Sequence, residues 1–224
     1  MDSVGARITR FKADLPTEVR LVAISKYHPV SCIREAYAAG QRIFGESRVQ
    51  ELVEKESTLH GTDIEWHFIG HLQTNKVKQI APFVSLIHAV DSLRLLEEID
   101  RQGARCGRTL RCLLQLHVAK EESKFGLTTD EARELLAQGR WKEFRNVQLC
   151  GIMCMASNTT DTARIRTDFR EARRFFEEAK RDYFPTDENF RERSYGMSGD
   201  WSIALDEGST MVRIGSAIFG PREY

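Results

Sequence analysis

Short apolar segments alternate with longer charged segments along the whole chain. Eight of the apolar segments have the length and the β-branched residues that are typical of buried strands. They cover residues 19–25, 42–45, 65–70, 85–90, 110–118, 148–155, 193–197 and 211–219. The segments between them place apolar residues at helical spacing. The pattern therefore predicts eight strands that alternate with helices.

Glycines and one capping motif mark several helix boundaries. A glycine stands where a left-handed residue would end a helix at Gly40, Gly103, Gly139 and Gly208. Thr128, followed three residues later by Glu131, is a capping-box pattern that predicts a helix start. The longest helix is expected over residues 162–183. Its buried stripe is predicted to consist of Ile165, Phe169, Ala172, Phe175, Phe176 and Ala179.

Eight alternating units are compatible with a closed (β/α)8 barrel or with an open doubly wound sheet. The number of strands favours the barrel. The phosphate-binding loops G-x-G-x-x-G and G-x-x-x-x-G-K-[ST], which are typical of open nucleotide-binding sheets, are absent from the sequence. No linker rich in Pro, Gly or Ser divides the chain. We therefore expect one α/β domain over residues 1–224, a single TIM-type barrel.

The charge balance narrows the classes of partner. The 224 residues include 33 basic and 33 acidic ones, so the formal net charge is zero. Without a net charge the protein has no long-range attraction to polyanions, which argues against nucleic acids and membrane surfaces as partners. The first residues lack the apolar core of a secretory signal, and the apolar segments are too short to cross a bilayer. We expect a cytoplasmic protein.

Five scattered cysteines fit reduced thiols in a core better than a disulfide framework. Cys150 and Cys154 are expected to share one face of a strand, too far apart along it to hold one metal ion. His67 and His71 bridge a strand and the loop after it, so we expect no metal site there either.

The end of the first strand carries a lysine. In (β/α)8 barrels the reactive groups cluster at the carboxyl ends of the strands. Lys26 has the side-chain parity of Val22 and Ile24, so it points into the barrel mouth if those two residues fill the interior. Loss of hydration there favours the uncharged amine, which can form a Schiff base with a carbonyl-bearing cofactor. The alternative is a lysine that extends from the strand end into solvent.

The last two strands end in small and hydroxylated residues. Ser198 and Gly199 follow the seventh strand, just before a short helix expected over residues 201–205. Gly215 and Ser216 follow the eighth strand, two residues after Arg213. Free backbone N–H groups at such sites bind anions, and barrels commonly bind a phosphate here. Each serine could instead be an ordinary helix N-cap.

Several motifs in order resemble the YggS-like or PROSC family of pyridoxal-phosphate-binding proteins, whose fold resembles the barrel domain of alanine racemases. They are AISK at 23–26, RIFGE at 42–46, WHFIGHLQTNK at 66–76, ESKFG at 122–126, GIM at 151–153, YGMS at 195–198 and GSTMVRIGSAIFG at 208–220. The resemblance covers most of the chain and implies pyridoxal 5'-phosphate as the cofactor.

The resemblance implies roles for individual residues. It assigns the Schiff base to Lys26, the phosphate to Ser198, Gly215 and Ser216, and the pyridine nitrogen to Arg213. The residues that we also expect at the cofactor are Ser47, His67, Met153 and Gly199. The family usually has Asn where this chain has Ser47, so a contact made by that Asn would here run through water.

The expected arginine at the pyridine nitrogen opposes protonation of that nitrogen, which makes the ring a weaker electron sink. The resemblance gives racemases a second base, a tyrosine from a separate domain, for which the chain up to Tyr224 leaves no room. We therefore expect a monomer that binds, buffers or delivers the cofactor in vitamin B6 and amino-acid homeostasis. PLP-dependent apo-enzymes and amino or keto acids are the further partners expected.

Three alternatives stay open. The chain could be a small amino-acid racemase, or another PLP-dependent enzyme, that uses Lys26 as its only base. It could also be a metabolite-binding barrel without a cofactor. Finally, Lys76, Lys120 or Lys124 could compete with Lys26 for the aldehyde, although none of them has the same strand parity.

Overall fold

Eight parallel strands form a closed barrel in the order of the sequence. The structure is a computed structural model, and it describes residues 2–119 and 125–221. The strands are β1 (Arg20–Ile24), β2 (Ile43–Glu46), β3 (Glu65–Phe68), β4 (Leu86–Val90), β5 (Leu110–Leu116), β6 (Val147–Cys154), β7 (Glu192–Ser194) and β8 (Met211–Ile214). Pairing of β1 with β8 closes the ring. The predicted barrel is confirmed.

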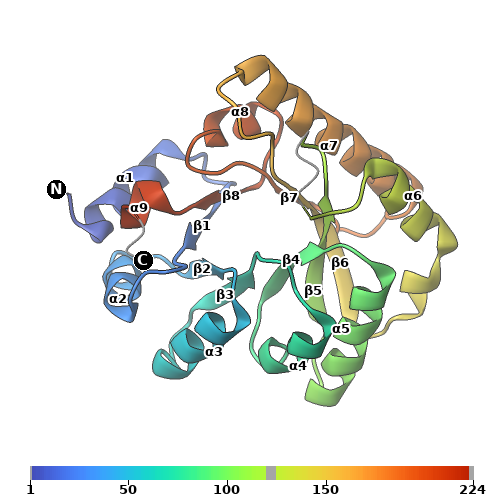
Figure 1. Ribbon diagram of the computed structural model, residues 1–224, viewed down its shortest axis with the longest axis horizontal. Helices are drawn as coiled ribbons and strands as arrows, with labels where there is room; N and C mark the ends of the chain where they lie inside the picture. Colours follow the sequence, from blue (N-terminus) through green and yellow to red (C-terminus); the bar gives the residue numbers. More distant parts are fainter. Residues whose placement is uncertain (1, 120–124, 222–224) are drawn as a thin grey trace.

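Helices lie outside the ring of strands (Figure 1). They are α1 (Val4–Asp14), α2 (Val30–Ala38), α3 (Val49–Thr58), α4 (Val77–Ile80), α5 (Leu93–Cys106), α6 (Thr129–Gln138), α7 (Thr162–Asp182), α8 (Trp201–Asp206) and α9 (Ser216–Phe219), with 3-10 turns η1 (Thr74–Lys76) and η2 (Arg140–Glu143). In the residues that the structure describes, no helix combines the length and the hydrophobicity that crossing a membrane requires.

Two local predictions for helices are confirmed. Thr128 and Glu131 form the capping box at the start of α6, and Gly139 ends this helix with a φ of 73°. All six residues of the predicted stripe on α7 are buried. Burial of this stripe against the barrel stabilises a helix whose other face is charged.

The predicted end of α5 was wrong. The helix continues through Gly103 to Cys106 and ends at Gly107, which has a φ of 63°. A Cβ on Gly103 would lie 2.7 Å from the carbonyl oxygen of Arg108. Gly103 is therefore needed for a close approach of two backbones, whereas Gly107 supplies the left-handed turn.

The predicted length of the last strand was also wrong. β8 ends at Ile214, and residues 216–219 form the short helix α9. Ile218 and Phe219 are buried from this helix rather than from a strand. A short apolar segment can be buried in either conformation, so its hydrophobicity alone did not distinguish them.

A bulge in β6 changes which residues face the barrel interior. The pairing of β5 with β6 shifts between Cys112 and Leu113, so that Cys150 is passed over and Gly151 pairs with Leu113. A Cβ on Gly151 would lie 1.9 Å from the carbonyl oxygen of Glu192. Because of the extra residue, Cys150 belongs to the inner cluster and Cys154 to the outer one. The prediction that these cysteines share a face was therefore wrong.

The hydrophobic core has two parts. The larger part lies between the strands and the surrounding helices. The smaller part fills the interior of the barrel with Val22, Ile24, Leu86, Ala89, Leu113, Cys150, Met153 and Met211. All five cysteines are free thiols. The inner cluster forms the floor on which the functional groups at the carboxyl ends of the strands are placed.

Candidate cofactor site

A cavity of about 430 Å3 opens at the carboxyl ends of the strands, and we call it the upper cavity. This volume lies in the usual range for small-molecule sites. The predicted site residues that line it are Lys26, Ser47, Met153, Ser198, Gly199, Arg213, Gly215 and Ser216. His67, the ninth predicted residue, does not line it. The first and the last two strands thus bring their predicted groups to one place.

Lys26 lies in the turn after β1 and is half-buried. Val22 and Ile24 both belong to the inner cluster, so the parity argument from the sequence holds. The strand itself ends two residues before Lys26, one residue earlier than predicted. Tyr27 has a φ of 66°, and in the described part of the chain no other residue except glycine has a positive φ. A backbone conformation of this kind needs support from neighbouring groups.

A buried ion cluster, formed by Lys55, Glu46 and Glu51, supports this turn. The ammonium of Lys55 lies 2.7 Å from a carboxylate oxygen of Glu46 and 2.7 Å from one of Glu51. It also donates a hydrogen bond of 2.7 Å to the carbonyl of Ser25. The same oxygen of Glu51 accepts the backbone N–H of Tyr27 at 2.6 Å. Both neighbours of Lys26, Ser25 and Tyr27, are therefore connected to one buried cation, Tyr27 through Glu51.

The cluster was not predicted from the sequence. Lys55 stands on α3 among charged residues, where a solvated side chain is the ordinary expectation. Glu46 is part of a motif that carried the family resemblance, but no role was attached to it. The side chain of Glu46 is completely buried, and this burial raises the pKa of its carboxyl group. Lys55 opposes that shift by its positive charge.

Arg213 lies at the floor of the upper cavity and is buried. Its guanidinium donates to the carbonyl of Ser194 at 2.6 Å, to the hydroxyl of Ser194 at 2.7 Å and to the carbonyl of Cys154 at 2.9 Å. Three of the five N–H donors of a guanidinium are thus used. Within residues 2–119 and 125–221, no carboxylate lies within ion-pair distance of this side chain. Arg213 is thus a buried cation without a carboxylate partner among the described residues, and it lines the cavity.

A row of hydrogen bonds continues from Arg213 across the barrel interior. The hydroxyl of Ser194 lies 3.1 Å from Nδ1 of His88, and Nε2 of His88 lies 3.0 Å from Nδ1 of His67. Among the described residues, His67 is thus connected to Arg213 through His88 and Ser194. His67 therefore lies in the hydrogen-bonded interior of the barrel and not in the cavity lining, although the sequence led us to expect it at the cofactor.

Both imidazoles in this row are neutral. Burial, together with the charges of Arg20 and Arg111, lowers the pKa of His67 to about 3. Burial also lowers the pKa of His88 well below its usual value, with a smaller effect of His67. Desolvation disfavours the charged imidazolium in each case. The row therefore orients Arg213 without adding a second positive charge.

The exits of β7 and β8 meet at one side of the cavity. The backbone N–H of Gly215 lies 3.4 Å from the hydroxyl of Ser198. Ser216 is exposed and opens α9, whose first backbone N–H groups have no partner within the helix. These two loops therefore bring hydroxyls and backbone donors to one place, as the sequence predicted.

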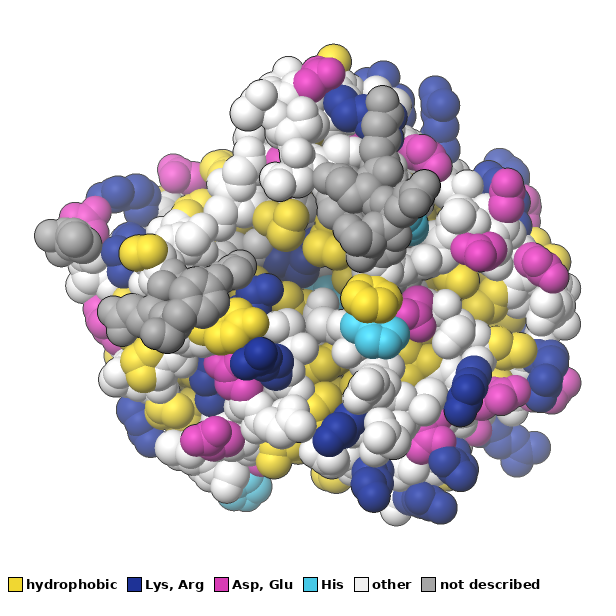
Figure 2. Space-filling model, in the orientation of Figure 1, with side chains coloured by type: hydrophobic (Ala, Val, Ile, Leu, Met, Phe, Trp, Pro, Cys, Tyr) yellow, Lys and Arg dark blue, Asp and Glu magenta, His cyan; other side chains and the backbone are white. Residues whose placement is uncertain are grey.

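Apolar side chains form the remaining wall and the rim. The wall consists of Ile24, Ile69, Met153 and Met155. Met197 and Phe125 stand at the rim with 37% and 56% of their surface exposed. Phe125 stacks on His71 with 4.2 Å between the ring centroids, and Gln115 donates to its carbonyl. Figure 2 shows hydrophobic side chains near the centre of this face and charged ones mostly at its edge.

Other lining residues were not predicted, and they include His28, Gly70, His71 and Gln115. Position 70 requires a glycine, because a Cβ there would lie 2.2 Å from the carbonyl oxygen of Ser47. His71 lies in the motif at residues 66–76, which carried the family resemblance without a role for this residue. His28 lies two residues after Lys26, and Gln115 lies within β5. Among the competing lysines, Lys76 lies in η1 and does not line the cavity. Lys120 and Lys124 lie outside the described residues.

Comparison with known proteins identifies the family. The model of the alanine racemase N-terminal domain matches residues 1–223. The pyridoxal phosphate homeostasis protein of Aquifex aeolicus is 37% identical over 205 residues, which are 92% of this chain and 88% of that protein. An alanine racemase of Clostridium difficile has the same fold, with a TM-score of 0.77 at 12% identity over 100% of this chain and 58% of the racemase.

The barrel is also similar to solved structures of PipY from Synechococcus elongatus. The form without PLP has a TM-score of 0.91 and 37% identity, and the alignment covers 97% of this chain and 100% of PipY. The form with PLP bound has a TM-score of 0.88 and 36% identity over the same shares of both chains. The chain therefore belongs to the family of the alanine racemase N-terminal domain, together with curated relatives named as pyridoxal phosphate homeostasis proteins.

Proposed function

We propose that this protein binds pyridoxal 5'-phosphate in the upper cavity and holds it as a Schiff base on Lys26. One observation carries the proposal: Lys26, Arg213 and the two small, hydroxylated loops line the same cavity. PipY, which is 36% identical and has the same fold, has been solved with PLP bound. When bound, this cofactor supplies an aldehyde for amines and an electron sink for carbanions.

The groups at the cavity floor fit the ring of this cofactor. Arg213 has N–H donors left over and no carboxylate beside it among the described residues, so it suits a neutral acceptor such as a pyridine nitrogen. Its permanent charge opposes protonation of that nitrogen. The apolar side chains of Ile24 and Met153 suit the faces of the ring.

The loops after β7 and β8 fit the phosphate. Ser198 and Ser216 offer hydroxyls, and Gly199 and Gly215 allow the backbone to approach an anion closely. Ser47 lines the cavity after β2 and would contact the cofactor through water. The phosphate ligands therefore come from two neighbouring strand exits, the usual location in this fold.

The biological role that we propose is to bind, buffer or deliver the cofactor in vitamin B6 and amino-acid homeostasis. The curated relatives carry the name pyridoxal phosphate homeostasis protein. The expected weak electron sink argues against robust catalysis. We further propose a monomer of one domain over residues 1–224 that acts in the cytoplasm and exchanges the cofactor with PLP-dependent apo-enzymes.

Absorbance spectroscopy tests the binding mode. The protein mixed with the cofactor is expected to show the visible band of a Schiff base, and borohydride is expected to fix the label on the peptide that contains Lys26. Lys26→Ala should abolish both signals, whereas the control Lys76→Ala should keep them. Retention of the band in Lys26→Ala would move the linkage to another lysine and would refute this part of the proposal.

One observation favours the alternative of a small racemase. His71 lines the cavity with its Nδ1 3.1 Å from a carboxylate oxygen of Asp91, so a second acid–base group is available beside Lys26. Incubation of the loaded protein with single L-amino acids, followed by chiral analysis, separates the two functions. Sustained formation of the D-isomer that is lost in His71→Gln would replace the carrier role by catalysis.

A further inference from the structure

A second cavity of about 580 Å3 lies at the amino ends of the strands, and we call it the lower cavity. Arg20 is the first residue of β1, and Glu192 is the first residue of β7. These two residues therefore lie at the end of the barrel opposite to Lys26. The charged side chains that line the lower cavity are Arg20, Lys180, Arg191 and Arg193 on the basic side and Glu18 and Glu192 on the acidic side.

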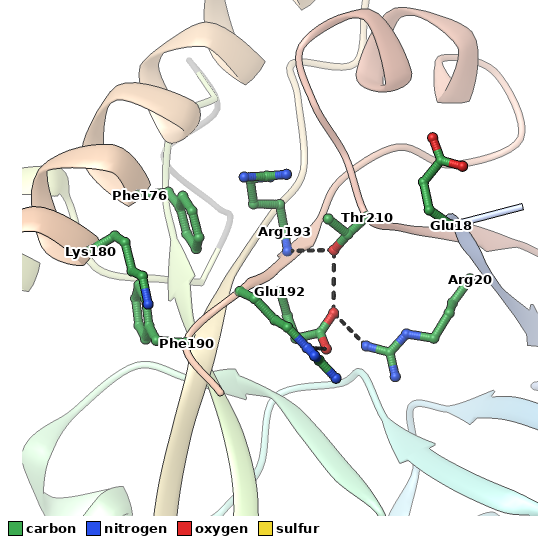
Figure 3. Close-up of a pocket in the computed structure, with 9 residues that line it drawn as sticks. Glu18, Arg20, Phe176, Lys180, Phe190, Glu192, Arg193 and Thr210 are labelled. Atoms are coloured by element: carbon green, nitrogen blue, oxygen red, sulfur yellow. Dashed lines mark hydrogen bonds and ion pairs between the residues drawn. The ribbon is translucent and has the colours of Figure 1, made fainter. Parts of the chain in front are cut away.

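Glu192 is already neutralised by arginines. Its side chain is only 4% exposed and forms an ion pair with Arg20. Arg111 and Arg191 lie 3.6 Å and 3.7 Å from the same carboxylate. The hydroxyl of Thr210 donates to it as well. Figure 3 shows Glu192 between Arg20 and Thr210, on the side of the cavity away from Lys180.

Lys180 and Arg193 have no such partner. The ammonium of Lys180 donates to the carbonyl of Asp187, and Nε of Arg193 donates to the carbonyl of Gly208. The guanidinium of Arg193 also lies over the ring of Phe176, 4.9 Å from its centroid. In the part of the chain that the structure describes, neither cation lies within ion-pair distance of a carboxylate.

Most arginines of α7, the helix that carries Lys180, differ from Lys180 and Arg193 because they form ion pairs. Five of its six arginines have a carboxylate within 4 Å, namely Arg164, Arg166, Arg170, Arg173 and Arg181, whereas Arg174 has none among the described residues. The whole chain has equal numbers of acidic and basic residues. The unpaired cations at the lower cavity therefore do not reflect a general excess of positive charge.

We propose that the lower cavity binds a small multivalent oxyanion, a phosphate ester or a polycarboxylate. Lys180 supplies an ammonium from α7 with donors beyond the one used by the carbonyl of Asp187, and Arg193 supplies N–H donors that its two contacts leave over. Charge-assisted hydrogen bonds from these two groups suit a ligand with oxygens on both sides. The edge of Phe176 gives an apolar surface for the rest of the ligand. This site is independent of the cofactor proposed for the upper cavity.

Calorimetric titration of the full chain with inorganic pyrophosphate and with citrate tests the proposal at low ionic strength. We expect binding of one anion per chain, weakened about tenfold by Lys180→Met and by Arg193→Gln. Arg173→Gln is the matched control, because it removes a cation from α7 that is paired with Glu177 and lies outside the cavity. This control should bind as the unaltered protein does.

The two anions separate the possible sources of the ligand, since tighter binding of pyrophosphate indicates a phosphate ester and tighter binding of citrate a polycarboxylate. Thermal denaturation of each variant shows whether it is folded, and Lys180→Met tests the site even if Arg193→Gln unfolds. Absence of binding, an equal loss in Arg173→Gln, or full affinity in Lys180→Met would overturn the proposal.

Discussion

The two ends of this barrel hold their charged groups in different ways. At the carboxyl end, Arg213 and Lys55 are buried, and Arg213 contacts only neutral acceptors. At the amino end, Arg20 is 31% exposed and pairs with the carboxylate of Glu192. The arginines at the amino end are therefore partly exposed to water and share one buried carboxylate, whereas the cations at the carboxyl end interact strongly with whatever is placed beside them.

This contrast separates two uses of a cation. A partly exposed arginine that shares its carboxylate with other arginines contributes little to the free energy of unfolding, and it can be replaced at small cost. A buried guanidinium without a carboxylate is expensive unless a ligand or a set of carbonyls receives its donors. The carboxyl end is thus the one where a substitution should affect both stability and binding.

The largest effect that we expect distinguishes the two ends by stability. Lys55→Met leaves the completely buried Glu46 without its cation and should lower the free energy of unfolding by about 3 kcal/mol. Arg20→Met, the counterpart at the amino end, should cost about 1 kcal/mol, because Arg111 and Arg191 remain beside the carboxylate of Glu192. Urea denaturation followed by tryptophan fluorescence measures both. Equal losses would show that Arg111 and Arg191 do not compensate for the loss of Arg20.

The next effect concerns cofactor affinity. Arg213→Lys should weaken binding of pyridoxal 5'-phosphate at least about tenfold, because one ammonium cannot serve Ser194, Cys154 and the ring together. Arg108 is the matched control, since it donates to the carbonyls of Ala81 and Val84 near the amino end. Arg108→Lys should keep the affinity in a spectroscopic titration. Unchanged affinity in Arg213→Lys would remove this residue from the site.

The smallest effect is a dependence of stability on pH that arises in the barrel interior. The pKa of His67 is about 3 in the folded protein and 6.5 in the unfolded chain, so only the unfolded chain takes up a proton as the pH falls below 6.5. Stability is therefore complete above that value and decreases toward pH 3. The arginines of the amino end do not titrate in this range.

Between about pH 7 and pH 5.5, each of the two buried imidazoles should cost about 1 kcal/mol of stability. Denaturation curves at both values give the slope. His67→Gln should remove about half of it, whereas His60→Gln should leave it unchanged, because the side chain of His60 is 81% exposed. A flat profile in the unaltered protein would mean that the interior admits the charged imidazolium.

Much of the fold and half of the cavity could be predicted from the sequence. Apolar periodicity gave the eight strands and the buried stripe of α7, since both depend on burial of a repeated pattern. Strand parity directed Lys26 toward the barrel mouth, and the small residues after the last strands indicated the second wall. These signals are local, because each is contained in a few consecutive residues.

The remaining features depend on contacts between distant segments. At the bulge, Gly151 lies against the backbone of Glu192, which is 41 positions later in the sequence. The contact of Lys55 with Ser25 joins α3 to the turn after β1, at a sequence separation of 30. A glycine or a lysine considered alone does not indicate its distant partner, so the sequence predicted neither feature.

The extra residue in β6 has a consequence for how such a pocket can evolve. Met153 and Met155 pack with the inner cluster only because the strand shifts by one position at Gly151. Without that shift, Ile152 and Cys154 would exchange places with them. One inserted or deleted codon would therefore replace two flexible thioethers by a branched hydrocarbon and a thiol. Ligand preference in this barrel can change by the length of a strand as well as by substitution.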